Sequence, residues 1–341
     1  MRLSPRELVL LVNAVARKEL TVYIPHLRAE ALEVDLASWG LRVFEEQVGM
    51  LDGALRALGH EGPRLVDLLW DSLLSAGVIL PRNVDELVEL MEECAEPPSL
   101  RSPQPRLVAL DTNVLYNATL TAASRLTRAR PPLLISSCVL EELARQATRR
   151  EPGSSSTLLK LCKARGAPQQ LLQKLRGMPG LAWRRAIAAL RERRRLASTY
   201  PLSSTPGCRR VGDYPIVRDY ASFARARGCR VTLVTHDRGL GTAASALGLP
   251  VLTLEPPERR VERLKPSALP DLLYYMAVNF MAVDVRGEHG WARLWPWWRG
   301  AQGEELLRGE LDVEVAPHLL PQLEGELEAL RRVEAALGGG P

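Results

Sequence analysis

Four acidic residues occupy positions from which a folded chain can build a divalent metal site. Asp111 ends the apolar run "RLVALD", and Asp237 ends a second apolar run, "CRVTLVTHD". Glu142 and Asp213 fall in the first turns of two segments with helical spacing. Carboxylates gathered in one place repel each other unless cations neutralise them, and oxygen ligands suit Mg²⁺ or Mn²⁺. Each acid by itself could be a helix cap, a turn residue or a surface residue. The hypothesis of a metal site therefore depends on the placement of all four acids together.

The helices and strands that must position these acids are predicted from an alternation of strand-like and helix-like segments, which begins at Leu107. We expect strands at 106–111, 131–136, 229–237 and 249–257, and helices at 117–130, 137–150, 213–228 and 238–248. Strands that alternate with helices predict right-handed crossovers and a parallel sheet covered on both faces. In such a sheet, ligands bind beyond the carboxyl ends of the strands, near the point where the strand order reverses. The four carboxylates are therefore expected at one rim of the sheet.

The segment 106–255 resembles a PIN domain, the nuclease module of toxin–antitoxin ribonucleases and RNA-processing enzymes. "LDTNVLY" matches the first motif of that family, with Asp111 as the leading metal ligand and Asn113 as the residue that supports it. "SSCVLEEL" resembles the second motif, whose acid directly precedes the leucine, so the resemblance selects Glu142 and not Glu141.

The third and fourth motifs follow in the order of the family. "GDYPIVRDYA" resembles the third and places its ligand at Asp213, so Asp219 is expected to be a solvated acid. "VTHDRGL" resembles the fourth, with Thr235 and Asp237 in the matching places; His236 between them should face away, because neighbouring residues of a strand point to opposite sides. The departure from the family is the long stretch between the second and third acids.

The resemblance implies a PIN-like α/β/α sandwich with a parallel central sheet and metal-dependent hydrolysis of RNA phosphodiester bonds. Two Mg²⁺ or Mn²⁺ ions would be held by the four acids, with Asn113 and Thr235 orienting the ligands. The expected products carry a 5′-phosphate and a 3′-hydroxyl. The chain is long for a toxin, which favours an endoribonuclease of RNA processing. The alternatives are a toxin-type ribonuclease and a non-catalytic RNA-binding or assembly module on the same scaffold.

Charge is distributed unevenly along the 341 residues, whose net charge is +5. Residues 1–100 carry 9 basic and 17 acidic side chains, a net −8, whereas residues 143–200 carry 14 basic and 2 acidic side chains, a net +12. A clustered basic segment is typical of a protein that binds a phosphate backbone, and RNA is the expected partner. The candidate phosphate contacts are Arg184, Arg185, Arg193, Arg194, Arg195, Arg209, Arg210 and Arg238. A solvated helical surface, or contacts with a partner subunit or with the acidic N-terminal region, are the alternatives.

Composition shifts divide the chain into three regions. A helical N-terminal domain is expected at 1–98, followed by a Pro- and Ser-rich linker. The nuclease domain spans 106–256 and includes a basic helical insertion at 152–212. A smaller α+β C-terminal region follows at 258–341, where "WARLWPWWR" is expected either to pack in a core or interface or to stack on bases.

The remaining features bound the class of protein. Five scattered cysteines without a CxxC pair indicate reduced thiols and no zinc site. The apolar N-terminal stretch is expected to begin a helix and not a signal peptide, and no segment approaches the length of a membrane span. We therefore expect a cytoplasmic protein without a membrane partner or a small-molecule cofactor, and leave a homo-oligomer open.

Overall fold

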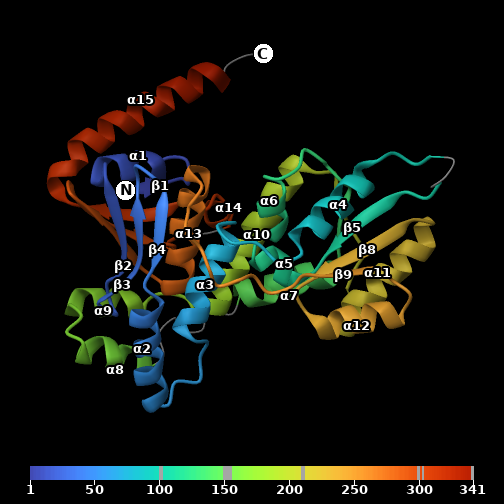
Figure 1. The fold of residues 1–341 in the computed structure, drawn as a ribbon, viewed down its shortest axis with the longest axis horizontal. Helices are drawn as coiled ribbons and strands as arrows, with labels where there is room; N and C mark the ends of the chain where they lie inside the picture. Colours follow the sequence, from blue (N-terminus) through green and yellow to red (C-terminus); the bar gives the residue numbers. More distant parts are fainter. Residues whose placement is uncertain (100–102, 149–155, 209–211, 298–299, 302, 339–341) are drawn as a thin grey trace. The chain divides into compact units, whose positions relative to one another are not determined.

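The chain folds into two compact units, each built from separate stretches of sequence. The computed structural model describes residues 1–99, 103–148, 156–208, 212–297, 300–301 and 303–338 (Figure 1). We name the units after their sheets. The antiparallel unit comprises Met1–Ser72, Glu151–Leu181 and Val261–Pro341. The parallel unit comprises Leu73–Arg150 and Ala182–Arg260. The C-terminal region thus joins the N-terminal one, in place of the three consecutive regions expected from composition.

The parallel unit has the architecture that the alternating pattern predicts. Its strands are β5 (Arg106–Leu110), β6 (Leu133–Ile135), β7 (Leu202–Ser204), β8 (Arg230–Thr235) and β9 (Val251–Thr253). Its helices are α4 (Val84–Ala95), α5 (Thr112–Tyr116), α6 (Thr119–Ala123), α7 (Ser137–Thr148), most of α10 (Leu181–Thr199), α11 (Asp213–Arg227) and α12 (Arg238–Ala246). All four strand pairs are parallel, in the order β7-β6-β5-β8-β9. The structure confirms a parallel central sheet within an α/β unit.

The core of the parallel unit includes residues that were expected in the N-terminal domain and in the basic insertion. The strands form it with Leu87 and Met91 of α4, which we had assigned to the N-terminal domain. Ala189 and Leu196 of α10 also lie in this core. The stretch 182–204 is therefore an integral helix and strand of the unit, and not a peripheral insertion, because its alanines and leucines recur on one face of the helix.

The antiparallel unit is built around a seven-stranded sheet in the order β1-β12-β11-β10-β2-β3-β4. Its strands are β1 (Arg2–Leu3), β2 (Glu19–Ile24), β3 (Ala29–Asp35), β4 (Gly40–Val43), β10 (Val283–Gly287), β11 (Gly290–Trp295) and β12 (Leu311–Val315). Its helices are α1 (Leu8–Val15), α2 (Glu45–Ala57), most of α3 (Leu65–Ser75), α8 (Ser156–Ala164), α9 (Gln169–Arg176), α13 (Leu269–Phe280), α14 (Glu304–Leu307) and α15 (Leu320–Gly338), with 3₁₀ turns at Pro266–Ala268 and Pro317–Leu319.

The expected, mostly helical N-terminal domain has no helix over residues 19–43, where the described chain forms β2, β3 and β4. Here the chain alternates between buried and more exposed residues, with Leu20, Val22 and Ile24 fully buried along β2. Period-two alternation with β-branched residues favours a half-buried strand over a helix. The acidic side chains of this region lie on β2 and β3 as well as on helices.

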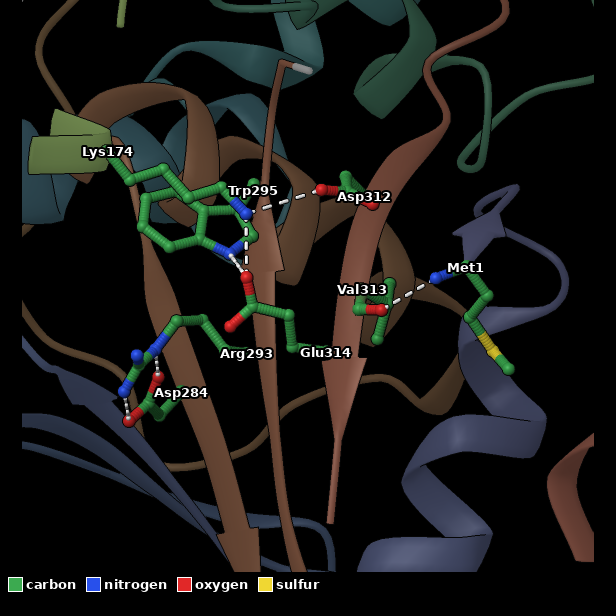
Figure 2. Close-up of polar contacts among 8 residues, drawn as sticks. All are labelled: Met1, Lys174, Asp284, Arg293, Trp295, Asp312, Val313 and Glu314. Atoms are coloured by element: carbon green, nitrogen blue, oxygen red, sulfur yellow. Dashed lines mark hydrogen bonds and ion pairs between the residues drawn. The ribbon is translucent and has the colours of Figure 1, made fainter. Parts of the chain in front are cut away.

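One face of the antiparallel sheet is apolar and the other is polar. Val283 and Val285 of β10 are fully buried on the apolar face, whereas Asp284 and Arg286 alternate with them on the polar face. Lys174 of α9 packs onto this polar face, 4.1 Å above the ring of Trp295, and its Nζ lies 2.7 Å from Glu314 (Figure 2). Trp295 is 1% exposed, so this tryptophan of the C-terminal motif serves packing.

Two further expectations concern cysteines and membranes. Cys138 and Cys208 form a disulfide, which corrects the expectation that all five cysteines are reduced. They are 70 residues apart without a recognisable motif, and the fold brings the start of α7 next to the segment after β7. In the described ranges, no helix combines the length and the apolar character needed to cross a membrane.

Candidate active site at the carboxyl ends of the parallel strands

The strand order of the parallel unit reverses between β5 and β8. From β5 the chain proceeds to β6 and β7 on one side, and then to β8 and β9 on the other. Figure 1 shows β5 and β8 side by side, as their register requires. Asp111 directly follows β5, and Thr235 ends β8. The crevice where open α/β sheets bind ligands therefore lies at these two residues.

Asp111 is the most buried acid of this rim, with 3% of its surface exposed. Its Oδ1 accepts a hydrogen bond from the backbone N–H of Thr112 at 2.6 Å. Its Oδ2 accepts from the Thr235 hydroxyl at 2.8 Å and from the Asn113 amide at 3.4 Å. All of these donors are neutral, and within the described ranges no lysine or arginine forms an ion pair with this carboxylate. Burial is the main cause that raises the pKa of Asp111 to about 6.

Glu142 is held beside Asp111 by a short chain of polar side chains. The Thr112 hydroxyl donates to Oε2 of Glu142 at 2.9 Å, and the Gln146 amide donates to Oε1 at 3.2 Å. The Tyr116 hydroxyl in turn donates to the side-chain amide oxygen of Gln146. The charge of Glu142 contributes to the raised pKa of Asp111, so the two carboxylates interact. Gln146 is not among the predicted site residues, although its i+4 spacing from Glu142 on one helix indicates that the two side chains are neighbours.

Asp237 lies at the same rim and caps a helix. Its Oδ1 accepts from the backbone N–H groups of Gly239 at 2.6 Å and Leu240 at 3.1 Å, at the start of α12. Its own N–H donates to the Thr235 hydroxyl at 2.9 Å. Thr235 thus connects Asp111 to the Asp237 backbone. His236 bonds to the Thr119 hydroxyl at 2.9 Å, away from this network, and burial lowers its pKa to about 4.

Asp219 is not the solvated acid that we expected. It is half-buried, and its Oδ2 accepts from the hydroxyls of Ser136 and Thr205, which follow β6 and β7. The next residue, Tyr220, donates to the Leu110 carbonyl at 2.6 Å and accepts from the Ser136 N–H at 2.8 Å. Asp219 therefore lies on the rim. Asp213, at the first residue of α11, is exposed.

The candidate phosphate-binding arginines differ in accessibility. Arg194, Arg195 and Arg238 are exposed, while Arg185 and Arg193 are half-buried. The Arg185 guanidinium lies 6.0 Å from the centre of the Tyr116 ring, close to the Glu142 network. Arg184 is 4% exposed, and burial lowers its pKa to about 9, so we leave it out of the RNA-binding surface. Arg209 and Arg210 lie outside the described residues.

The donor chemistry of the rim suits a hard divalent cation. The carboxylates of Asp111 and Glu142 and the amide of Asn113 are oxygen ligands of the type that Mg²⁺ and Mn²⁺ prefer. A buried carboxylate with neutral partners alone is destabilised by its charge, which a cation would offset. Across the described ranges, no three His, Cys, Asp or Glu side chains are gathered as a metal site.

The raised pKa of Asp111 predicts a specific pH dependence of stability in EDTA. The folded pKa of about 6 exceeds the ordinary value of 3.8, so the folded state binds more protons than the unfolded state between these values. The free energy of unfolding should therefore fall as pH rises from about 4 to about 6, by roughly 2 kcal/mol from this group over that range. In Asp111→Asn this part of the fall should be missing. Urea unfolding at pH 4.5 and pH 7 measures it, and identical pH profiles of the two proteins would refute the assignment.

Comparisons with known proteins identify no family. No family model matches the chain, and no curated protein matches it. A solved domain of a functionally unknown protein from Methanocaldococcus jannaschii DSM 2661 aligns with 47% of this chain and 98% of that domain, at 19% sequence identity. The TM-score is 0.31, which is too low for the likeness to carry an argument.

Proposed function

We propose that this chain is a metal-dependent endoribonuclease of cytoplasmic RNA processing, with its active site at the Asp111 rim of a PIN-like unit. The observation that carries the proposal is the Asp111 carboxylate, buried at the switch point of a parallel sheet and surrounded by neutral donors. Perturbed carboxylates in a ligand-binding crevice are candidate functional groups. The four motifs that resemble the PIN family support the same residues.

The rim residues divide into ligands and groups that orient them. Asp111 and Glu142 would hold Mg²⁺ or Mn²⁺ with Asp237 of the same rim, and α11 would supply the third acid in chain order, either Asp219 or Asp213. When bound, two such ions supply charge neutralisation for the phosphoryl group and lower the pKa of an attacking water. Thr235 and Asn113 fix the Asp111 carboxylate through their hydrogen bonds to Oδ2. Gln146, one turn further along α7, does the same for Glu142, and Tyr116 of α5 holds Gln146.

RNA would be bound by the basic part of α10. Arg185 lies next to the Glu142 network, while Arg194 and Arg195 are exposed between two and three turns further along the same helix. Arg238 opens α12 beside Asp237 and is also exposed. These arginines supply cationic donors of the kind that a phosphate backbone requires.

Incubation of the chelator-treated protein with mixed RNA, with and without added Mg²⁺ or Mn²⁺, tests the proposal. A nuclease fragments the RNA after the metal is added back. A non-catalytic RNA-binding or assembly module retains RNA on a filter with either metal and leaves its length unchanged, and that result would reject the proposed activity.

The two acids of α11 should differ in their effect on cleavage. Asp219 is held on the rim by two hydroxyls, whereas Asp213 is exposed at the helix start. We expect Asp219→Asn to lower the cleavage rate at saturating RNA by at least about tenfold, since losing an outer partner of a metal site costs roughly 10–100-fold. Asp213→Asn should have a smaller effect. Circular dichroism verifies that both variants are folded. A larger loss of cleavage rate in Asp213→Asn than in Asp219→Asn would identify Asp213 alone as the third acid of the metal site.

A further inference from the structure

The polar face of the antiparallel sheet contains a hollow at the β10–β11 hairpin that the proposed nuclease site does not use. The hollow has a volume of about 470 Å³. Its lining consists of Asp284, Arg286, Gly287, Gly290, Trp291 and Arg293. The strand register pairs Asp284 with Arg293 and Arg286 with Trp291, so the charged groups and the indole lie side by side. This volume is within the range of small-ligand sites.

The two arginines of the hollow are fixed by a buried acid. Arg293 donates to Asp284 through Nε at 2.6 Å and Nη2 at 3.0 Å, as Figure 2 shows. Arg286 donates to the same carboxylate at 3.2 Å, and its guanidinium lies 3.6 Å from the centre of the Tyr23 ring. Asp284 is 2% exposed, whereas the Arg286 side chain is 46% exposed. A guanidinium has five N–H donors, so Arg286 keeps donors for a ligand while Asp284 and Tyr23 hold its orientation.

Arg286 is the more accessible of the two cations that line this hollow. The cations Arg286, Arg293 and Lys174 are balanced by Asp284, Asp312 and Glu314, but the Arg286 side chain is 46% exposed against 21% for Arg293, so an anion is expected at Arg286. The nearest acids along the same face of β12, Asp312 and Glu314, lie 3.4 Å and 2.7 Å from the ammonium of Lys174. An anion at Arg286 therefore meets a donor-rich surface.

Trp291 supplies the apolar side of the hollow. Its side chain lies on the polar face of the sheet and is 39% exposed, in contrast to Trp295 of the same strand, which Lys174 covers. The Arg293 guanidinium lies 5.8 Å from the Trp291 ring centre. An exposed indole beside oriented guanidinium groups is the combination on which nucleic-acid bases stack.

We propose that this hollow binds a phosphorylated nucleoside, with the base stacked on Trp291 and the phosphate bonded to Arg286. The nucleoside is either a free nucleotide or one unit of a single-stranded RNA; both present the same aromatic base and phosphate. The site belongs to the antiparallel unit and does not depend on the carboxylates of the parallel unit.

Isothermal titration calorimetry of the full chain with AMP, adenosine and a short oligo(A) tests the proposal. We expect AMP to bind, and adenosine to bind about tenfold more weakly because it lacks the phosphate. Trp291→Ala should weaken AMP binding about tenfold through the lost stacking, and Arg286→Gln should bring AMP to the level of adenosine. Arg308→Gln, an exposed arginine of the same unit, is the control and should bind AMP like the wild type.

The outcomes distinguish a free nucleotide from an RNA strand as the ligand, and this binding site from the proposed nuclease site. Oligo(A) that binds more tightly than AMP and loses that advantage in Trp291→Ala identifies an RNA strand as the ligand, whereas equal affinities identify a free nucleotide; either supports the site. No heat of binding with AMP, or equal AMP affinities in wild type, Trp291→Ala and Arg286→Gln, would overturn it. Asp111→Asn should bind AMP unchanged, so loss of cleavage and loss of this site are distinguishable.

Discussion

Asp111→Asn is expected to reduce metal-dependent RNA cleavage at least about 100-fold while leaving the fold intact. Mutation of a residue that hydrogen-bonds to a metal ligand typically lowers activity or metal affinity by about 10–100-fold. Loss of the ligand itself should therefore lower activity further. The substitution keeps the size of the side chain and removes the charge that burial disfavours. The Thr112 N–H and the Thr235 hydroxyl remain next to the new amide. Little packing is therefore lost.

Single-turnover cleavage at saturating RNA measures this effect, and circular dichroism with thermal unfolding in EDTA verifies the fold. Glu141→Gln is the matched control, because Glu141 is exposed on the same helix next to Glu142 and belongs to no part of the network. It should cleave like the wild type. Wild-type turnover in Asp111→Asn would remove Asp111 from the active site.

The second large effect is expected on RNA affinity when the accessible arginines of α10 are replaced. Changing Arg185, Arg191, Arg193, Arg194 and Arg195 to Gln should weaken binding roughly 100-fold across RNA sequences. Each phosphate contact releases counterions, so the slope of log affinity against log salt should flatten by about 0.7 per contact for a single strand. Cleavage at saturating RNA should be near normal, because the carboxylates are unchanged.

Fluorescence anisotropy over a salt series measures the slope, with Arg225→Gln/Arg227→Gln as the control. These two exposed arginines end α11, the helix whose start lies at the rim. They should change the slope little. If the α10 arginines instead contact a partner subunit or the acidic residues of the N-terminal region, the slope stays unchanged while the light-scattering mass or the free energy of unfolding changes. That combination would replace RNA binding with assembly as the role of α10.

The parallel unit could be predicted from the sequence because its signals are local. β5 and β8 are runs of strand-forming residues that end at Asp111 and near Asp237, and α7, α11 and α12 have clear starts. β7 could not be predicted in the same way, since "LSS" has no strand signal by itself and is ordered by pairing with β6. The strands at 19–43 were missed although their alternation is visible in the sequence.

The position of a site residue could be predicted from the sequence only where a single strand end fixes it. Asp111 is fixed by the end of β5, and its contact with Thr235 follows from the pairing of β5 with β8. The contacts of Asp219 depend on Ser136 and Thr205, which three separate elements bring together. The Cys138–Cys208 disulfide likewise joins residues whose proximity only the fold creates.

The nature of the product ends tests the central claim most directly. Wild-type protein, freed of metal with EDTA and then supplied with Mn²⁺, is incubated with a defined single-stranded RNA, and the ends are identified by phosphatase and ligase treatment. We predict no cleavage in EDTA, cleavage after Mn²⁺ is added, and products with a 5′-phosphate and a 3′-hydroxyl. Cleavage that persists in EDTA, or products that end in a 2′,3′-cyclic phosphate, would contradict a metal-dependent nuclease centred on Asp111.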